Sequence, residues 1–258
     1  MHDMNPDSSD EIKVFWQPGC TSCLRTKEFL TRHQVPFTSV NVMEHGFKDL
    51  TRFGLRQVPI VTRGDHWANG QVLEDVARLT GITLKKSKLL SPPELQDKLV
   101  DILRGARRYL DQIPETDLTR NLPDRPRSYA DLVHHIFNVA DALLEHERGI
   151  PLVYASYNRT PESGKGDKAS LCAYADEMIA GVQRWWEQGG SAKDFSLPAD
   201  VYYGRQTLRD YLERTTWHCG QHTRQLMMVL ETMGLTPDRP LGPSTFAGLP
   251  MPEKVWDS

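Results

Sequence analysis

The sequence predicts a multidomain protein in which an α/β domain is followed by an all-α domain. Short apolar runs rich in β-formers alternate with helical patterns over residues 1–82. A basic stretch with a proline pair then interrupts the pattern at residues 83–93, where we expect a linker. Beyond it, apolar residues recur every three or four positions in four long segments, which is the spacing of a helical bundle over residues 94–258.

The first domain is predicted to place its helices on a small sheet. Strand patterns lie at "IKVFW", "PFTSVNV" and "VPIVTR", and helical patterns lie at "LRTKEFLTRH", "GFKDLTRFGL" and "VLEDVARLTG". The stretch "GDHWANG" is predicted to be a turn, and Gly81 is expected to end the last helix. The resulting order, β-α-β-α-β-turn-α, is typical of an α/β unit.

The second domain is predicted to contain four helices with defined start signals. They are "PELQDKLVDILRGARRYLDQI", "SYADLVHHIFNVADALLEHERG", "KASLCAYADEMIAGVQRWWEQGG" and "TLRDYLERTTWHCGQHTRQLMMVLETMG". Ser91 and Glu94 form a capping-box pair with prolines in the first turn of the first of these helices. The long connections at 150–167 and 189–206 are of the kind that more often serves function. The proline-rich tail at 235–258 carries Phe246, Leu249 and Trp256 and is expected to pack over the bundle.

Composition limits the class of protein. The chain has 258 residues, a net charge of −3 and 39 % hydrophobic residues, as ordinary globular proteins have. It carries no basic patch that would favour nucleic acid and no apolar run of the roughly 20 residues that a membrane span needs. The acidic, polar N-terminus differs from a secretory signal. We therefore expect a cytoplasmic protein with neither a nucleic-acid nor a membrane partner, and a homodimer is left open.

Cys20 and Cys23 form the motif with the clearest chemistry. The chain has 4 cysteines, too few for a disulfide framework, and no second Cys-x-x-Cys exists to complete a zinc knuckle. Cys20 is expected at a helix N-terminus, where the helix dipole stabilises a thiolate. Cys20 is therefore the predicted attacking sulfur and Cys23 the resolving one. Two structural cysteines near a loop are the alternative.

The stretch "QVPIV", about 35 residues after this motif, resembles the thioredoxin and glutaredoxin superfamily, as does the tryptophan–small–glycine turn of "HWANG". The resemblance covers residues 12 to 82 and implies a thioredoxin-like domain with a cis proline facing the active cysteine. It implies that Val58, Pro59 and Gly70 bind the substrate, with glutathione or another low-molecular-weight thiol as co-substrate. Gln71 follows Gly70 where the family has an acidic pair, so the identity of the thiol stays open.

Histidines define a second candidate site in the bundle. His218 and His222 lie on the buried stripe of the last predicted helix, one turn apart. His135 lies at the edge of the buried stripe of the second helix, whereas His134 points to its polar face. Three converging imidazoles could bind a divalent metal and leave one coordination position open. From the spacing alone, a pair of satisfied core histidines is an equal alternative.

A second-helix histidine in "DLVHHI" and the last-helix pattern "HxxxHxxQ" in a four-helix domain resemble the DinB-like superfamily. This superfamily includes stress-induced proteins and metal-dependent thiol transferases and isomerases. The resemblance covers residues 94 to 234 and implies that His135, His218 and His222 are metal ligands, with His134 kept open as the alternative to His135. Zinc is the metal expected by default, and nickel or another divalent ion is the alternative.

Two kinds of neighbouring residue are predicted to play lesser parts. Cys219, beside His218, is assigned to packing, with a redox or ligand role left open. The arginines near the start and middle of the last helix could hold a carboxylate but are expected to be solvated: Arg205, Arg209, Arg214 and Arg224.

The two motifs together predict a thiol-dependent enzyme. It would couple thiol–disulfide exchange at Cys20 and Cys23 to metal-dependent transfer of a small, glutathione-like thiol onto an electrophile or disulfide, with a separate thiol reductase as a further partner. The alternative is a glutaredoxin-type disulfide oxidoreductase with a non-catalytic DinB-like module that binds a ligand or senses a metal during stress.

Overall fold

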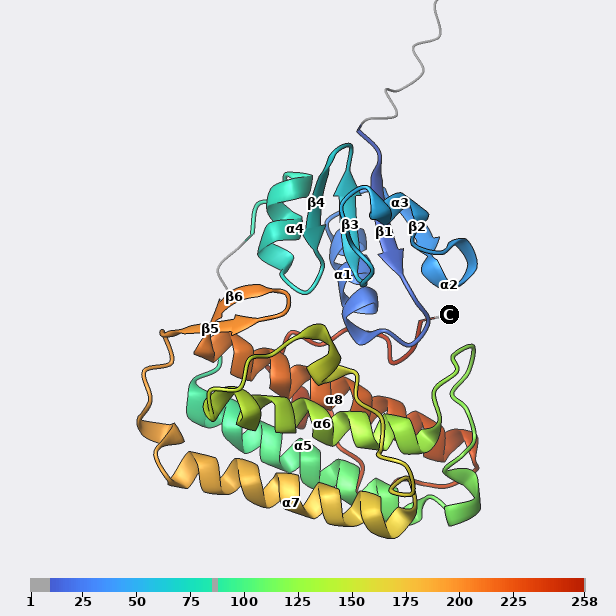
Figure 1. Cartoon of the computed structure of the whole chain (residues 1–258), viewed down its shortest axis with the longest axis vertical. Helices are drawn as coiled ribbons and strands as arrows, with labels where there is room; N and C mark the ends of the chain where they lie inside the picture. The colour runs from blue at the N-terminus through green and yellow to red at the C-terminus, as the bar shows by residue number, and fades with distance from the viewer. Residues whose placement is uncertain (1–9, 85–87, 258) are drawn as a thin grey trace, which may run out of the picture. The chain divides into compact units, whose positions relative to one another are not determined.

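The computed structural model describes residues 10–84 and 88–257 (Figure 1). Contacts divide the chain into two compact units. One contains residues 1–87 and 252–258, and the other contains residues 88–251. No helix in the described residues is long and apolar enough to cross a membrane.

The first unit is a four-stranded mixed sheet with helices, as a thioredoxin-like domain has. Its strands are β1 (Ile12–Trp16), β2 (Thr38–Asn41), β3 (Ile60–Arg63) and β4 (His66–Asn69), in the order β2-β1-β3-β4. Strand β1 pairs parallel to β2 and antiparallel to β3, and β4 pairs antiparallel to β3. The helices are α1 (Thr21–Arg32), α2 (Val42–His45), α3 (Lys48–Thr51) and α4 (Leu73–Thr80).

Side chains on both faces of this sheet are buried. Val14 and Val61 belong to one apolar cluster with Phe29 of α1. Their strand neighbours Phe15 and Ile60 belong to another, which also contains Cys23. Successive strand residues point to opposite faces, so the alternation of these pairs gives the sheet two cores. The Cys-x-x-Cys motif is thereby anchored in the interior at its second cysteine.

The structure differs from the predicted elements of this unit at two places. The predicted turn at 64–70 is interrupted, because residues 66–69 form strand β4, and Gly64 and Asp65 turn the chain between β3 and β4. Thr62 and Trp67 are paired in this hairpin. The helix predicted at "GFKDLTRFGL" is shorter than expected and covers only residues 48–51 (α3). A separate short helix, α2, precedes it and ends at Gly46, whose φ is +70°.

The second unit is a four-helix bundle, as predicted. Figure 1 shows α5 (Pro92–Gln112), α6 (Tyr129–Glu147), α7 (Lys168–Glu187) and α8 (Leu208–Thr232) as long helices lying side by side. Helix α8 packs against α5 and α6, and α7 packs against the same two helices. The shorter elements are η1 (Glu115–Asp117), η2 (Tyr154–Tyr157), η3 (Gly190–Ala192), β5 (Pro198–Val201), β6 (Gly204–Thr207) and α9 (Pro243–Phe246). The β5–β6 hairpin lies in a connection that was expected to be an irregular loop.

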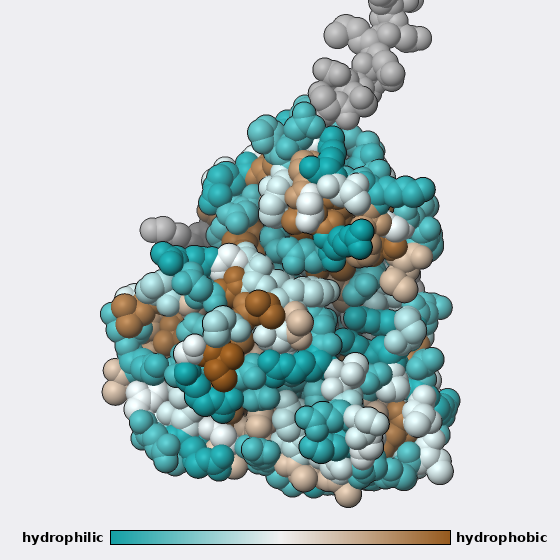
Figure 2. Space-filling model, viewed as in Figure 1, coloured by the Kyte–Doolittle hydropathy of each residue, from teal (hydrophilic) through white to brown (hydrophobic). Residues whose placement is uncertain are grey.

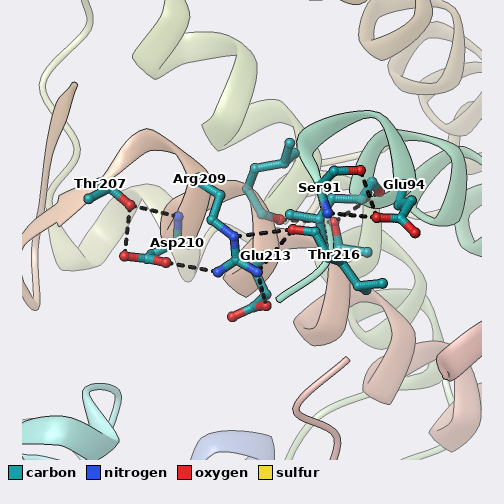
Figure 3. A network of polar contacts seen from close by, with 10 residues as sticks. Ser91, Glu94, Thr207, Arg209, Asp210, Glu213 and Thr216 are labelled. Atoms are coloured by element: carbon teal, nitrogen blue, oxygen red, sulfur yellow. Dashed lines mark hydrogen bonds and ion pairs between the residues drawn. The ribbon is translucent and has the colours of Figure 1, made fainter. Parts of the chain in front are cut away.

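Capping residues start the helices where the sequence places them. Ser91 and Glu94 form the capping box of α5, and Thr207 accepts the N–H of Asp210 at the start of α8. Arg209 ties the two starts together (Figure 3). Its Nη2 lies 3.2 Å from the carbonyl oxygen of Leu90, and its Nη1 lies 2.9 Å from Asp210 Oδ1. Arg209 is thus a paired arginine rather than the solvated one that was predicted.

The face of the molecule that is visible in Figure 2 is mainly polar. Figure 2 shows teal over most of the visible face, with brown limited to small separate groups. The exposed large apolar side chains of the second unit are Leu89, Ile150, Val153, Tyr154 and Leu197. Single exposed apolar side chains are normal for globular proteins, so the bundle keeps most of its apolar side chains in its core.

The carboxylate of Glu147 at the end of α6 gives the bundle a pH-dependent stabilisation. It accepts hydrogen bonds from Lys193 Nζ at 2.7 Å, Trp185 Nε1 at 2.9 Å and His146 Nδ1 at 3.0 Å. Burial acts to raise its pKa, but these donors outweigh burial and lower the pKa to about 2. The ionised form is therefore stabilised in the folded state.

We expect Glu147→Gln to reduce the free energy of unfolding at pH 7 by about 3 kcal/mol. Since the pKa is lower in the folded state, the stabilisation is complete above the unfolded value of 4.5 and is lost as pH falls through about 2. The difference between wild type and variant in urea unfolding should therefore shrink between pH 5 and pH 2. The exposed Glu187→Gln is the control; a Glu147→Gln difference independent of pH would contradict the prediction.

Candidate functional site

The Cys20–Cys23 pair lies at the N-terminus of α1. Cys20 is the N-cap residue, and its Sγ accepts the backbone N–H of Cys23 at 3.2 Å. The two sulfurs form a disulfide. Cys23 is fully buried, whereas Cys20 is only partly buried. An outside thiol can therefore reach Cys20 more readily than Cys23, as the predicted roles require.

Val58, Pro59 and Gly70 lie against the same helix. The Val58–Pro59 peptide bond is cis, as the resemblance implied. Val58 shares an apolar cluster with Cys23, and Cys20 packs against that cluster. The N–H of Gly70 donates to the carbonyl oxygen of Pro59 at 3.0 Å. The structure thus brings the predicted substrate-binding residues and the cysteine pair together.

Thr26 of α1 is a further member of this site that the sequence did not point to. Its hydroxyl donates to the carbonyl oxygen of Gly70 at 2.9 Å. A Cβ atom added to Gly70 would lie 2.6 Å from this hydroxyl and 2.8 Å from Pro59 Cγ. Only a residue without a side chain fits between them, which explains the glycine of the "HWANG" turn.

Gln71 occupies the position where the resemblance implies an acidic residue. Its Oε1 accepts the hydroxyl of Ser22 at 2.8 Å, and its N–H donates to Asn69 Oδ1 at 3.0 Å. Gln71 is buried, with 8 % of its surface exposed. The position is therefore filled by a neutral side chain that is held within the fold.

The C-terminal residues reach the loop before Cys20. The N–H of Gly19 donates to the carbonyl oxygen of Asp257 at 3.3 Å, and a Cβ atom added to Gly19 would lie 2.5 Å from Cη2 of Trp256. Lys27 of α1 lies 2.7 Å from the Asp257 carboxylate and 3.6 Å above the Trp16 ring. Trp256 therefore packs within the first unit, where Gly19 leaves room for its ring, and the prediction that it packs over the bundle is wrong. The prediction holds for Phe246 of the same tail, which lies against Gly220 of α8.

The second candidate site is formed by His135 of α6 and by His218 and His222 of α8. The Nε2 atom of His218 lies 3.3 Å from that of His135 and 3.2 Å from that of His222. All three side chains are buried, and one nitrogen from each lies within 4.8 Å of the others. This histidine triad could hold a metal ion.

The geometry of the triad fits a metal better than a set of hydrogen bonds. Two nitrogens bound tetrahedrally to zinc at about 2.0–2.1 Å lie about 3.3 Å apart, close to the distances between these Nε2 atoms. His222 Nδ1 lies 2.7 Å from Gln225 Oε1, which places its proton on Nδ1 and its lone pair on Nε2. His218 Nε2 carries at most one proton, so it cannot donate a hydrogen bond to the Nε2 atoms of both His135 and His222.

Electrostatics keep the triad in the form that binds metals. Burial is the main cause that lowers the pKa of each of the three histidines. The positive charge of Arg127 further lowers the pKa of His135 and His222, and that of Arg214 lowers the pKa of His218. Imidazoles must be neutral to coordinate a metal, so the surroundings favour coordination.

His134 and Cys219 lie outside the triad. His134 is partly buried and stacks on Tyr174, with ring centroids 5.0 Å apart. The Cys219 thiol donates to the carbonyl oxygen of Ile136, with its Sγ 3.3 Å away, and burial raises its pKa to about 12. A neutral buried thiol in this bond is a packing group, so both residues lie as the sequence predicts.

Comparison with known families agrees with both halves of this description. A model of the DinB superfamily matches residues 53–226, and a glutaredoxin model matches residues 12–67. No curated protein sequence matches the chain. The chain belongs to the DinB superfamily and carries a glutaredoxin domain at its N-terminal end, which confirms the two resemblances stated from the sequence.

Proposed function

We propose that the chain is an enzyme that couples thiol–disulfide exchange in the first unit to metal-dependent transfer of a small thiol in the second. The observation that carries this proposal is the histidine triad, in which His218 Nε2 lies 3.3 Å from His135 Nε2 and 3.2 Å from His222 Nε2, in a chain that also has a Cys-x-x-Cys pair. A divalent metal ion held there, zinc by default, would lower the pKa of a bound thiol.

The triad's residues would act by binding and orientation. His135, His218 and His222 would supply three neutral nitrogens, and Gln225 would keep His222 turned toward the centre. With three protein ligands, a coordination position is left for the substrate thiol. The thiolate formed would attack an electrophilic carbon or one sulfur of a disulfide, and the displaced group would leave with the electron pair.

Cys20 and Cys23 would complete the cycle when the product is a mixed disulfide. The Cys20 thiolate would attack that disulfide and release one thiol, and the Cys23 thiolate would then attack Cys20 Sγ and release the second. The product is the Cys20–Cys23 disulfide. Two electrons from a thiol reductase, or from two molecules of a small thiol such as glutathione, would restore the dithiol. A reducing cytoplasm suits this cycle.

A screen of small thiols tests the proposal. Purified full-length protein should contain about one divalent ion per chain by elemental analysis. It should consume a small thiol in the presence of an electrophile or disulfide, lose this activity to a chelator and regain it with zinc. Cys20→Ser should slow turnover of a disulfide substrate. Normal turnover by Cys20→Ser would rule out the coupling.

The second candidate function is a disulfide oxidoreductase with a non-catalytic bundle. The completeness of the site around Cys20, Val58, Pro59 and Gly70 within the first unit favours it. Protein that contains no metal, and whose exchange activity is unchanged by loss of His218, would support this function over the coupled one.

A further inference from the structure

Arg214 is a buried charge beside the histidine triad. It lies four residues before His218 on α8, so it is one turn away on the same face of the helix. Only 5 % of its surface is exposed. In the described part of the chain, its Nε and Nη1 atoms have no hydrogen-bond partner. This departs from the sequence prediction, which expected a solvated arginine.

Aromatic rings surround this guanidinium. Its Cζ lies 4.9 Å from the ring centroid of Tyr157 and 5.3 Å from that of Tyr203. Burial acts to lower the pKa of Arg214, but the nearby phenols of Tyr202, Tyr203 and others outweigh burial and raise it. The guanidinium therefore stays charged, and the groups that act on it most strongly are tyrosines, one of which, Tyr202, is hydrogen-bonded to it.

Two other partly buried arginines of the bundle have acidic partners. Arg209, on the same helix, pairs with Asp210 and with Glu213, 2.6 Å away. Arg107 of α5 pairs with Asp176 at 2.9 Å. Across residues 10–84 and 88–257, by contrast, no carboxylate lies within ion-pair distance of Arg214. A buried charge without a counter-charge is costly, so a negative charge from outside the chain would stabilise Arg214.

Two more arginines add positive charge at the triad. Arg125 and Arg127 lie just before α6, and the charges of both act on His135 and His222. Burial and the charge of Arg127 lower the pKa of Arg125 to about 9, which leaves it protonated at neutral pH. The centre would thus combine a divalent cation with several guanidinium groups, an excess of charge that an anionic ligand offsets.

We propose that the Arg214 guanidinium forms an anion subsite beside the histidine triad, which holds a carboxylate of the substrate one helical turn from the metal position. A carboxylate fits because guanidinium N–H groups without a partner bind carboxylates through charge-assisted hydrogen bonds. The assignment rests on the proposed function for its metal, and it names the substrate class: small organic acids, either as the thiol itself or as its acceptor.

Calorimetry on the full chain with succinate, and separately with inorganic phosphate, tests the subsite. Succinate should bind the wild type, Arg214→Gln should weaken binding at least tenfold, and Arg214→Lys should retain part of the affinity. The control Arg209→Gln, whose charge is already paired, should bind as the wild type does. The carboxylate assignment is overturned if phosphate binds through Arg214 and succinate does not bind. It is also overturned if wild type and Arg214→Gln bind succinate equally well.

Thermal unfolding gives a readout that does not need a ligand. Arg214→Met removes the unpaired charge and keeps an apolar chain among the tyrosines, so it should raise Tm in buffer without carboxylates. A lower Tm would assign Arg214 a structural part and contradict the subsite. Metal content is measured on the same samples. If the protein contains no metal but binds succinate through Arg214, the subsite is supported and the proposed metal chemistry is refuted. If the protein contains metal but its succinate binding does not depend on Arg214, only the subsite is refuted.

Discussion

Replacement of Cys20 by serine should lower the rate of thiol–disulfide exchange by about a thousandfold or more, the scale seen when an enzyme loses its nucleophile. Cys20 is the N-cap of α1 and the more exposed cysteine of the pair. A serine hydroxyl at this position stays protonated at neutral pH and cannot attack a disulfide. The measurement is the reduction of a generic disulfide by the pre-reduced full chain, followed by stopped flow with a coupled reductase.

Other cysteine variants separate a nucleophile from a structural sulfur. Cys23→Ser keeps the attacking thiol and removes the resolving one, so it should accumulate a mixed disulfide on Cys20 that mass spectrometry detects. Cys172→Ser changes a thiol outside the first unit and should exchange at the wild-type rate. A Cys20→Ser protein that is correctly folded yet nearly as fast as wild type would refute the role of Cys20.

Loss of His218 should lower the affinity for zinc by at least about 100-fold, since even second-shell changes cost 10–100-fold in metal affinity. His218 Nε2 is the central atom of the triad, within 3.3 Å of the Nε2 atoms of both His135 and His222. Removing it leaves two nitrogens, from different helices, to hold the ion. The measurement is a competition titration with a chromophoric chelator, together with metal content after dialysis.

His134 provides a matched control, because it is the chain neighbour of His135 on the same helix. It stacks on Tyr174 and lies outside the triad. His135→Ala should therefore lose zinc as His218→Ala does, whereas His134→Ala should retain it. Equal zinc affinity for wild type and His218→Ala would show that the triad is a set of core histidines, the alternative that the sequence spacing left open.

Elements whose signals are local could be predicted from the sequence. The starts of α5 and α8 lie at Ser91 and Thr207, because a capping bond joins residues only three positions apart. The inward direction of His218 and His222 follows from the same short-range periodicity. The triad could be assembled because each of its helices places its histidines on the buried face.

Features that depend on distant partners could not be predicted in this way. Strand β4 exists because it pairs with β3, and its residues "HWAN" have little strand pattern of their own. The burial of Arg214 depends on Tyr157 and Tyr203, which come from separate elements. A signal was nevertheless present, since Arg214, His218 and His222 recur at four-residue intervals on one face of α8.

Because residues 252–258 belong to the first unit, truncation of the chain affects the two units differently from what their order in the sequence suggests. A stop codon after Met251 would leave every helix of the bundle intact and would instead damage the redox unit. It would remove Trp256 from Gly19, the residue before Cys20, and Asp257 from Lys27 of α1. A fragment that ends at residue 87 would lack the same C-terminal segment, residues 252–258. The first unit is therefore encoded by two separate parts of the gene, one on each side of the part that encodes the bundle. A domain swap with a single junction would leave the first unit without its C-terminal segment.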